Sequence, residues 1–141
     1  MPVFWNKTIT VFNKYEDTQT GLITWYKHVL INCFWKESNN EVNVGNVKLA
    51  SNGHIIRIPQ NSLYVSPTIW TTLSAEEKAE KFTLQPGDIL YKGETNFVID
   101  EMTAGQRSSD FLAENEYNIC TIKAVNENVD LPNGHYYVRG D

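Results

Sequence analysis

Apolar and polar residues alternate with a period of two through most of this chain of 141 residues, and closely spaced turn signals interrupt the alternation. Ile9 and Val11 alternate with threonines in the first such run, and a longer run covers residues 22–35. Because side chains two residues apart point to the same face of a strand, this pattern predicts β-strands. The short connections between them predict antiparallel pairing.

Four strands are expected in the first 58 residues. Gly21 suits the first turn, because glycine tolerates a positive φ, and the fourth strand should end at Pro59. Polar turns are expected at residues 36–40 and 51–53, with Gly45 breaking the segment between them. The alternation in residues 22–35 predicts two apolar faces, with Trp25, Val29, Ile31 and Cys33 on one and Tyr26, Leu30 and Phe34 on the other.

Helix signals appear in the middle of the chain. A Ser-Pro pair at residues 66–67 and a capping-box pattern from Ser74 to Glu77 predict a helical excursion within residues 66–82. A second, shorter helical turn is expected near residue 111, capped by Ser108 or Asp110. Further strands are expected at residues 89–92, after a Pro-Gly turn, and at residues 97–100, 119–125 and 135–138, the last after a turn at 131–134.

Together these patterns predict an all-β protein, a single antiparallel β-barrel or sandwich of about eight strands with one or two short helices inserted. Residues 1–141 are expected to form one domain, because the length suits a single core and no linker or repeat divides the chain. Hydrophobic residues make up 41% and charged residues 21%, proportions that argue against disorder.

The charge and hydropathy of the chain exclude several classes of partner. A net charge of −5, with lysine and arginine scattered, argues against a nucleic-acid groove. No apolar stretch approaches the roughly 18 residues of a membrane span, and the first residues lack the pattern of a signal peptide. We therefore expect no membrane partner and no sequence-specific binding of nucleic acid.

Catalytic groupings are not evident. There is no nucleophile-elbow pattern and no phosphate-binding loop, and the three histidines, His28, His54 and His135, lie far apart in the sequence. The adjacent carboxylates fall in turns or on the charged helix, at Glu16-Asp17, Glu76-Glu77 and Asp100-Glu101. We expect a protein that is not an enzyme and holds no cofactor or metal. A small hydrolase with carboxylates from distant strands stays open as an alternative.

Two cysteines, Cys33 and Cys120, each lie in an apolar run typical of a core strand. They are expected to be reduced, buried residues. A disulfide would require an oxidising compartment, and the spacing of cysteines and histidines does not suit zinc. The sequence leaves open whether the two thiols are close in space.

Several segments carry a resemblance that spans nearly the whole chain. They are Trp5–Asp17, Thr20-Gly21, Thr24–His28, Leu84–Asp88, Arg107–Asp110 and Leu131–Tyr136. In these segments the chain resembles an uncharacterised family of small proteins from bacteriophages and prophages of Gram-positive bacteria. Its layout, an N-terminal hairpin, a barrel and a late Gly-Asp…Gly hairpin before a short helix, is also similar to that of phage head–tail connector proteins of the head-closure or stopper type.

The resemblance implies a structural protein of the phage neck, found in the virion and, during assembly, in the host cytoplasm. Such proteins form a homo-oligomeric ring that joins the DNA-filled head to the tail, and this chain would be a monomer in isolation. Its partners would be neck proteins on the adaptor or portal side and on the tail side. A negative chain without a basic stripe suits a ring through which DNA must slide.

The loop before the second helical turn is the expected contact surface. Its small central residues would let it adapt to a partner, and its arginine would pair with a carboxylate of a neighbouring subunit. These residues are Met102, Thr103, Ala104, Gly105, Gln106 and Arg107. The alternative function is a carbohydrate-binding or tail and baseplate accessory module, which would use exposed aromatic residues such as Trp25, Trp35 and Trp70 as stacking platforms.

Overall fold

The computed structural model describes residues 5–44, 47–115, 118–129 and 134–141, and within residues 38–44 and 47–52 it describes the backbone alone. In this part of the chain, strands predominate and the helices are short. The elements are β1 (Lys7–Glu16), β2 (Ile23–Val44), β3 (Val47–Pro59), α1 (Pro67–Trp70), α2 (Ala75–Glu80), β4 (Ile89–Lys92), α3 (Ser108–Glu114), β5 (Ile119–Asn128) and β6 (His135–Gly140).

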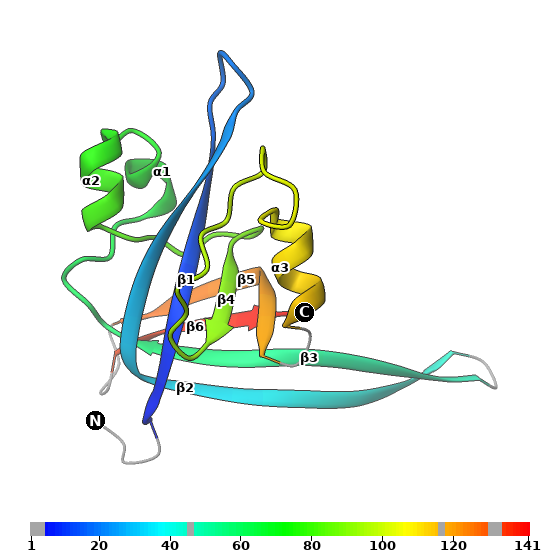
Figure 1. Cartoon of the computed structure of the whole chain (residues 1–141). Helices are drawn as coiled ribbons and strands as arrows, with labels where there is room; N and C mark the ends of the chain where they lie inside the picture. The colour runs from blue at the N-terminus through cyan, green and yellow to red at the C-terminus, as the bar shows by residue number, and fades with distance from the viewer. Residues whose placement is uncertain (1–4, 45–46, 116–117, 130–133) are drawn as a thin grey trace.

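The strands form one antiparallel sheet that closes on itself in the order β1-β2-β3-β6-β5-β4, with β4 paired back to β1 (Figure 1). This confirms the predicted all-β, antiparallel fold class. The predicted number of strands is wrong, because the described residues form six strands instead of about eight. They also form three short helices, where one or two were expected.

Two expected turns do not exist, since strands run through them. Residues 36–40 continue β2, and residues 51–53 lie inside β3. The two stretches pair with each other, with Ser38 opposite Gly53 and Asn39 opposite Asn52. An uninterrupted ladder satisfies the backbone groups of these polar residues, and this outweighs their local preference for turns. The expected break at Gly45 and the expected turn at residues 131–133 lie outside the described residues.

The strand expected at residues 97–100 is also absent; this segment is irregular. It follows β4, whose two sides are already paired with β1 and β5. The sheet is therefore closed at this point and offers the segment no free edge. Instead the segment crosses the sheet, and its Ile99 is buried.

Other local predictions are confirmed. The Asp88 N–H donates to the Gln85 carbonyl at 3.1 Å, and Gly87 has a φ of 96°, so the Pro-Gly pair forms the expected turn before β4. The Ser74 hydroxyl accepts a hydrogen bond from the Glu77 N–H at 3.3 Å and begins α2. Helices α1 and α2 both lie within the predicted excursion at residues 66–82. No helix in the described ranges is long and apolar enough to cross a membrane.

Two groups of buried side chains hold the fold together. The larger group lies inside the closed sheet and receives residues from all six strands: Ile9, Val11, Leu30, Cys33, Trp35, Ile56, Ile58, Phe82, Leu84, Leu90, Cys120, Ile122, Tyr136 and Val138. The smaller group lies on the opposite face of β1, β4 and β5, where α3 and the segment before it cover the sheet: Phe12, Ile89, Ile99, Phe111 and Ile119. Alternating residues of these strands are therefore buried on both faces.

Both cysteines belong to the larger group and are free thiols, as expected. Burial raises the pKa of Cys33 and of Cys120 to about 12. Neither thiol is therefore a reactive thiolate near neutral pH.

A two-stranded arm extends from the closed sheet (Figure 1). The pairing of β2 with β1 ends at Cys33, and the pairing of β3 with β6 begins at His54. Residues 38–44 and 47–52 pair with each other, and no third strand of the described chain pairs with them. We call these two stretches the arm.

Candidate functional site

The loop predicted as a contact surface lies between the buried Ile99 and α3, and we call its residues 101–107 the 101–107 loop. The Asp100 carboxylate organises its first half, accepting hydrogen bonds from the Met102 N–H at 3.0 Å and the Thr103 hydroxyl at 2.8 Å. These two bonds lower the pKa of Asp100. The Asp100 N–H also donates to the Gln106 carbonyl at 2.7 Å, which closes the loop at its base.

A second carboxylate organises the other half of the loop. Asp110, in the first turn of α3, accepts hydrogen bonds from the N–H groups of Gly105 at 3.1 Å and Arg107 at 3.2 Å. Asp110 thus takes part in capping α3, as expected, although the N-cap residue is Arg107. The Arg107 Nε donates to the Glu101 carbonyl at 3.2 Å, inside the loop itself. The loop is therefore internally braced, which differs from the expectation of an adaptable tip.

All six residues expected at this contact, from Met102 to Arg107, are exposed. Met102 is 79% exposed and the nearby Val98 is 63% exposed. The loop thus presents apolar side chains to solvent from a backbone that hydrogen bonds hold in place. This arrangement suits a preformed contact surface.

A second candidate surface lies where β2 exchanges β1 for β3 as its partner. A β-bulge interrupts the register of β2 with β1 here, since Lys7 lies opposite Cys33 whereas Ile9 lies opposite Leu30. Asn32 lies in the bulge with a φ of 58°, and no other non-glycine residue in the described part of the chain has a positive φ. Asparagine is one of the few residues that adopts this left-handed conformation readily.

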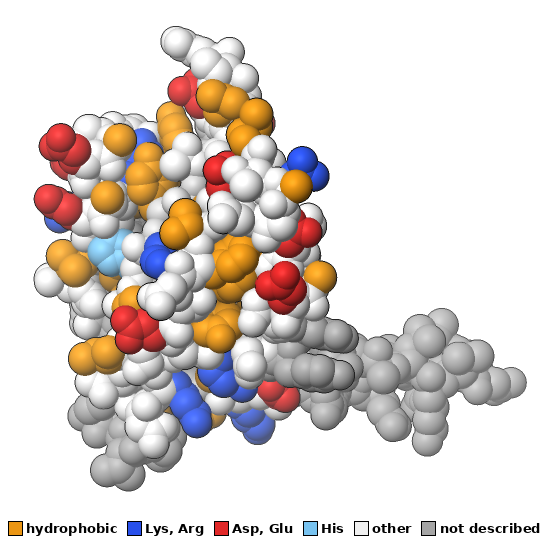
Figure 2. Space-filling view, in the orientation of Figure 1, with side chains coloured by type: hydrophobic (Ala, Val, Ile, Leu, Met, Phe, Trp, Pro, Cys, Tyr) orange, Lys and Arg blue, Asp and Glu red, His pale blue; other side chains and the backbone are white. Residues whose placement is uncertain are grey.

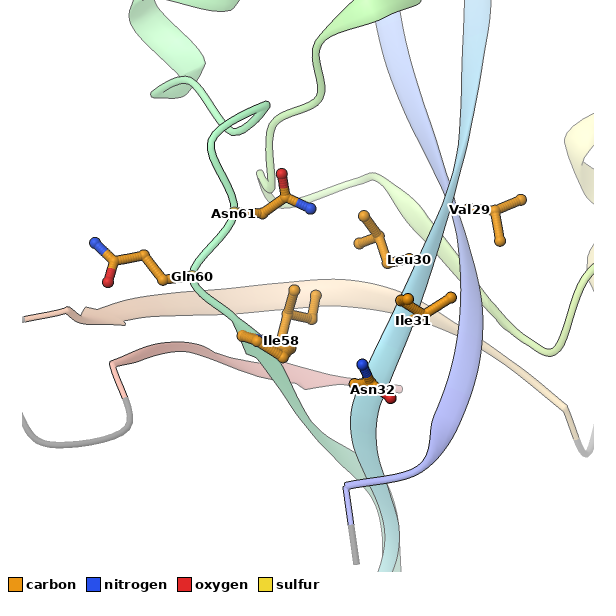
Figure 3. A pocket seen from close by; sticks show the side chains of 8 residues that line it. Val29, Leu30, Ile31, Asn32, Ile58, Gln60 and Asn61 are labelled. Carbon is orange, nitrogen blue, oxygen red and sulfur yellow. The ribbon is translucent and has the colours of Figure 1, made fainter. Parts of the chain in front are cut away.

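An open cleft of about 230 Å³ lies beside the bulge, and we call it the corner cleft (Figure 3). Its floor includes Leu30 and Ile58, which are 4% and 1% exposed and belong to the core. Its rim includes Ile31, which is 66% exposed, and Figure 3 shows Leu30 and Asn61 on facing sides of the gap. The lining residues are Val29, Leu30, Ile31, Asn32, Ile58, Pro59, Gln60 and Asn61.

Sequence reasoning missed the corner cleft, although one signal was present. In a regular strand Asn32 would share a face with Leu30 and Phe34, both apolar. A polar residue that tolerates a positive φ, at a position expected to be apolar, is a signature of a bulge.

The comparison with protein families matches residues 4–141, which is nearly the whole chain and includes both candidate surfaces. The chain belongs to DUF6751, a family of unknown function. Among curated proteins and among solved structures, nothing matches the chain significantly. Membership of DUF6751 therefore supplies no activity.

The tryptophans considered for sugar stacking are largely covered in this DUF6751 chain. Trp70 is fully buried and Trp35 is 7% exposed. Trp25 is half-buried against the smaller core group, and the Lys14 ammonium lies 5.9 Å from the centre of its ring. Stacking of a sugar requires an open aromatic face, which Trp35 and Trp70 do not offer.

The three histidines each contact an aromatic ring. His28 lies against Phe82, and burial lowers its pKa. The Nδ1 atom of His54 accepts a hydrogen bond from the Trp35 indole at 3.0 Å, and burial lowers the pKa of His54 also. His135 packs edge-on against Trp5. Across the residues that the structure describes, no three metal-ligating side chains gather into a site.

Asp88 is a buried carboxylate that sequence reasoning read only as part of a turn. It is fully buried and accepts hydrogen bonds from the Asn13 amide at 2.8 Å, the Lys14 N–H at 2.9 Å and the Gln85 amide at 3.3 Å. Burial raises its pKa to about 7, against the effect of these donors. The Asp88 carbonyl also accepts the Ile122 N–H at 2.8 Å. Asp88 thus joins β1 and β5 at the start of β4.

Proposed function

We propose that this protein is a non-enzymatic assembly component that docks onto other protein subunits, as a ring of the phage neck between the DNA-filled head and the tail. The phage setting rests on the segments that resemble phage and prophage proteins. The docking role rests on the arm. In this proposal the protein acts in the virion and is made and assembled in the host cytoplasm.

The arm supports a docking role because it lacks a third strand. A two-stranded hairpin is marginally stable in water by itself, and stability normally requires a third strand or a packed face. Each strand of the arm also has an outer edge that pairs with no other described strand. Such edges are templates for pairing with another chain. A partner subunit that covers the arm would satisfy both needs.

The distribution of charge agrees with a ring around DNA. Figure 2 shows acidic and basic side chains interspersed over the visible face of the body, and the chain has a net charge of −5. A protein that must let DNA pass should not bind phosphate tightly, and tight binding requires clustered lysines and arginines. The exposed, braced 101–107 loop offers a second contact surface for neck proteins on either side of the ring.

The proposal is tested by shortening the arm in a phage that encodes this protein. Removing residues 40–51 and joining the strands by a two-residue turn should leave the body folded, because both described core groups lie outside that segment. We expect filled heads and free tails to accumulate without joining, as seen by electron microscopy, and infectivity to be lost. Infectious particles of normal appearance, made with a shortened arm, would overturn the proposal.

A further inference from the structure

We infer that the corner cleft receives the arm of a second copy of this chain. The inference rests on the proposed assembly function and specifies one of its contacts. It would make the interface between copies head-to-tail, with an arm on one side and a cleft on the other.

The cleft is shaped for an extended segment, since it lies between two diverging strands of the sheet. β2 pairs with β3 only from Phe34, opposite Arg57. Before that point, residues 29–32 and 58–61 form opposite walls of the cleft (Figure 3). Pro59 lies in one wall and has no N–H with which to continue the ladder. An additional strand or hairpin edge can enter such a gap by the strand-addition mode of peptide recognition.

The chemistry of the walls favours an uncharged, partly aliphatic occupant. Among the described residues that line the cleft, none has an ionisable side chain. Leu30 and Ile58 form an apolar floor, and the exposed Ile31 adds an apolar rim. The side-chain amides of Asn32 and Gln60 make no hydrogen bond within the described residues. They can therefore offer donors and acceptors to the backbone of an occupant.

The arm has the matching composition. Its stretches read Ser-Asn-Asn-Glu-Val-Asn-Val at residues 38–44 and Val-Lys-Leu-Ala-Ser-Asn at residues 47–52. Only Glu41 and Lys48 are charged, and the register sets aliphatic residues opposite one another, Val42 with Leu49 and Val44 with Val47. Natural edge strands are usually protected by charges or prolines. Because the arm has few charged residues and no proline in these two stretches, its edges are poorly protected, which favours an arm that is covered by another chain.

The arm cannot occupy the cleft of its own chain. The cleft and the end of the arm lie at opposite ends of the same β2–β3 ladder, which runs from Phe34 to Val44 along β2. Ten residue steps at about 3.3 Å each separate them by about 33 Å. An arm that occupies the cleft must therefore come from another copy. A contact between two different surfaces of identical chains repeats around a ring or along a filament, which agrees with the proposed ring.

Complementary variants test the contact. Ile31→Asp places a charge at the cleft without disturbing the core, because Ile31 is 66% exposed, and Val44→Asp places one on the arm. Ile69→Asp is the matched control, since Ile69 is an isoleucine of α1 that is 54% exposed. In concentrated solution, native mass spectrometry should detect oligomers for the wild type and the control. Either single variant should weaken self-association by roughly tenfold to a hundredfold.

Mixing the two variants gives the decisive readout. An intact arm of the Ile31→Asp copy can enter the intact cleft of the Val44→Asp copy, so the mixture should form a dimer containing one of each and nothing larger. A second mixture, of Ile31→Cys with Val44→Cys copies, should form a disulfide between the two. Ile31→Cys mixed with Ile69→Cys should not, because Ile69 lies on α1, outside the cleft and the arm.

The outcomes separate the contact from the function. If the wild type associates but the single variants associate equally well, or the mixture fails to form the mixed dimer, the inferred contact is wrong and the assembly function stands. If neither oligomers nor the specific disulfide form, the contact is also wrong. The assembly function is then judged separately by the phage with the shortened arm.

Discussion

The backbone conformation of Asn32 sets the bend in β2 and determines which of the adjacent side chains are buried. Its left-handed backbone inserts an extra residue into β2, and a bulge of this kind bends a strand. As a result Leu30 and Cys33 are both buried in the core, while Ile31 between them is exposed. The sequence pattern had assigned Ile31 and Cys33 to one face. That assignment is wrong, because the bulge shifts the alternation by one residue.

Substitution of Asn32 tests this role. Asn32→Gly should leave the free energy of unfolding nearly unchanged, because glycine adopts a positive φ readily. Asn32→Val should lower it by about 1–2 kcal/mol, because a β-branched side chain is strained in the left-handed region. Urea unfolding followed by tryptophan fluorescence measures both. Equal stability of the two variants would contradict the argument.

Asp88 gives stability a dependence on pH. Its folded pKa of about 7 lies above its ordinary value of 3.8 because the carboxyl is buried. Between these values the folded state binds more protons than the unfolded state, so the contribution of Asp88 to stability rises as pH falls from about 7 to 4. The expected change is on the order of a few kcal/mol.

Asp88→Asn should remove this contribution, so the variant should be less stable than the wild type at pH 4 and the difference should shrink as pH rises through about 7. The difference between wild type and variant, measured by urea unfolding from pH 4 to 8, isolates Asp88 from the histidines. Asp100→Asn is the control. The pKa of Asp100 is lowered from its ordinary value of 3.8, so its contribution to stability changes with pH only below about pH 4. A difference that is independent of pH would show that Asp88 is ionised throughout.

At the scale of elements, a buried lysine fixes α2 to the sheet. Lys78 is 4% exposed, donates to the Leu73 carbonyl and lies 4.1 Å from the centre of the Tyr15 ring. The centre of the Trp70 ring of α1 lies 5.7 Å from the same ammonium. The charged composition of α2 gives no sign in the sequence that the ammonium of Lys78 lies close to aromatic rings.

Lys78→Met keeps the aliphatic stem but removes the ammonium. We expect the free energy of unfolding to fall by about 1–3 kcal/mol, from the lost cation–π contacts and the unpaired Leu73 carbonyl. Lys81→Met, three residues further along, should change it by less than about 0.5 kcal/mol. Thermal unfolding followed by circular dichroism compares the two. A similar loss of stability in both variants would show that the effect comes from the change in net charge and not from the buried contacts of Lys78.

The 101–107 loop holds the residues that the sequence predicts as a contact surface, from Met102 to Arg107. Deleting residues 103–106 should leave a folded monomer but prevent heads from joining tails. The deletion also removes the hydrogen bonds that Thr103, Gly105 and Gln106 make with Asp100 and Asp110, which brace the loop. Met102→Asp is therefore the sharper variant, because Met102 is 79% exposed and its side chain can change without loss of the brace. Normal infectivity of phage carrying Met102→Asp would rule out Met102 as a contact.

The sequence predicts correctly those features of the fold that depend on residues close together in the chain. The turn at Gly87 and the start of α2 at Ser74 depend on residues within four positions of one another, and the sequence contains them all. The continuation of β2 and β3 through polar residues depends on pairing between chain segments. The irregular path around Ile99 depends on closure of the sheet by β1 and β5. Pairing partners distant in the sequence leave no local signal, so these features could not be predicted.

The two candidate surfaces, the 101–107 loop and the corner cleft, also differ in how far the sequence predicts them. Glycine and small residues identified the 101–107 loop from the sequence, although its bracing by Asp100 and Asp110 was not foreseen. The corner cleft is made by a bulge in β2 and by the end of β3, and its walls are about 30 residues apart along the chain, from Val29 to Pro59. A single asparagine in an apolar run was the only trace of it.

On the scale of the whole molecule, closure of the sheet leaves unpaired strand edges where strands continue past one of their two neighbours, and the arm is the longest such part. Within the body, each described strand has two neighbours, because β4 pairs with β1. The pairing between neighbours is incomplete, however, and β2 before Phe34 pairs with β1 alone. The arm is one of two described hairpins whose strands pair only with each other; residues 13–16 of β1 and 23–26 of β2 form the other, shorter one. The arm therefore offers the longest unpaired edges for association through backbone pairing.

This difference between body and arm predicts a pattern of amide hydrogen exchange. In the isolated protein, amides of residues 38–44 and 47–52 should exchange much faster than those of β1, β4 and β6, because a two-stranded hairpin opens at little cost in free energy. In the assembled particle the same amides should become protected, while those of the body change little. Mass spectrometry of proteolytic fragments measures both states. Arm amides that are already as protected as the body in the monomer would show that the arm needs no partner to be stable.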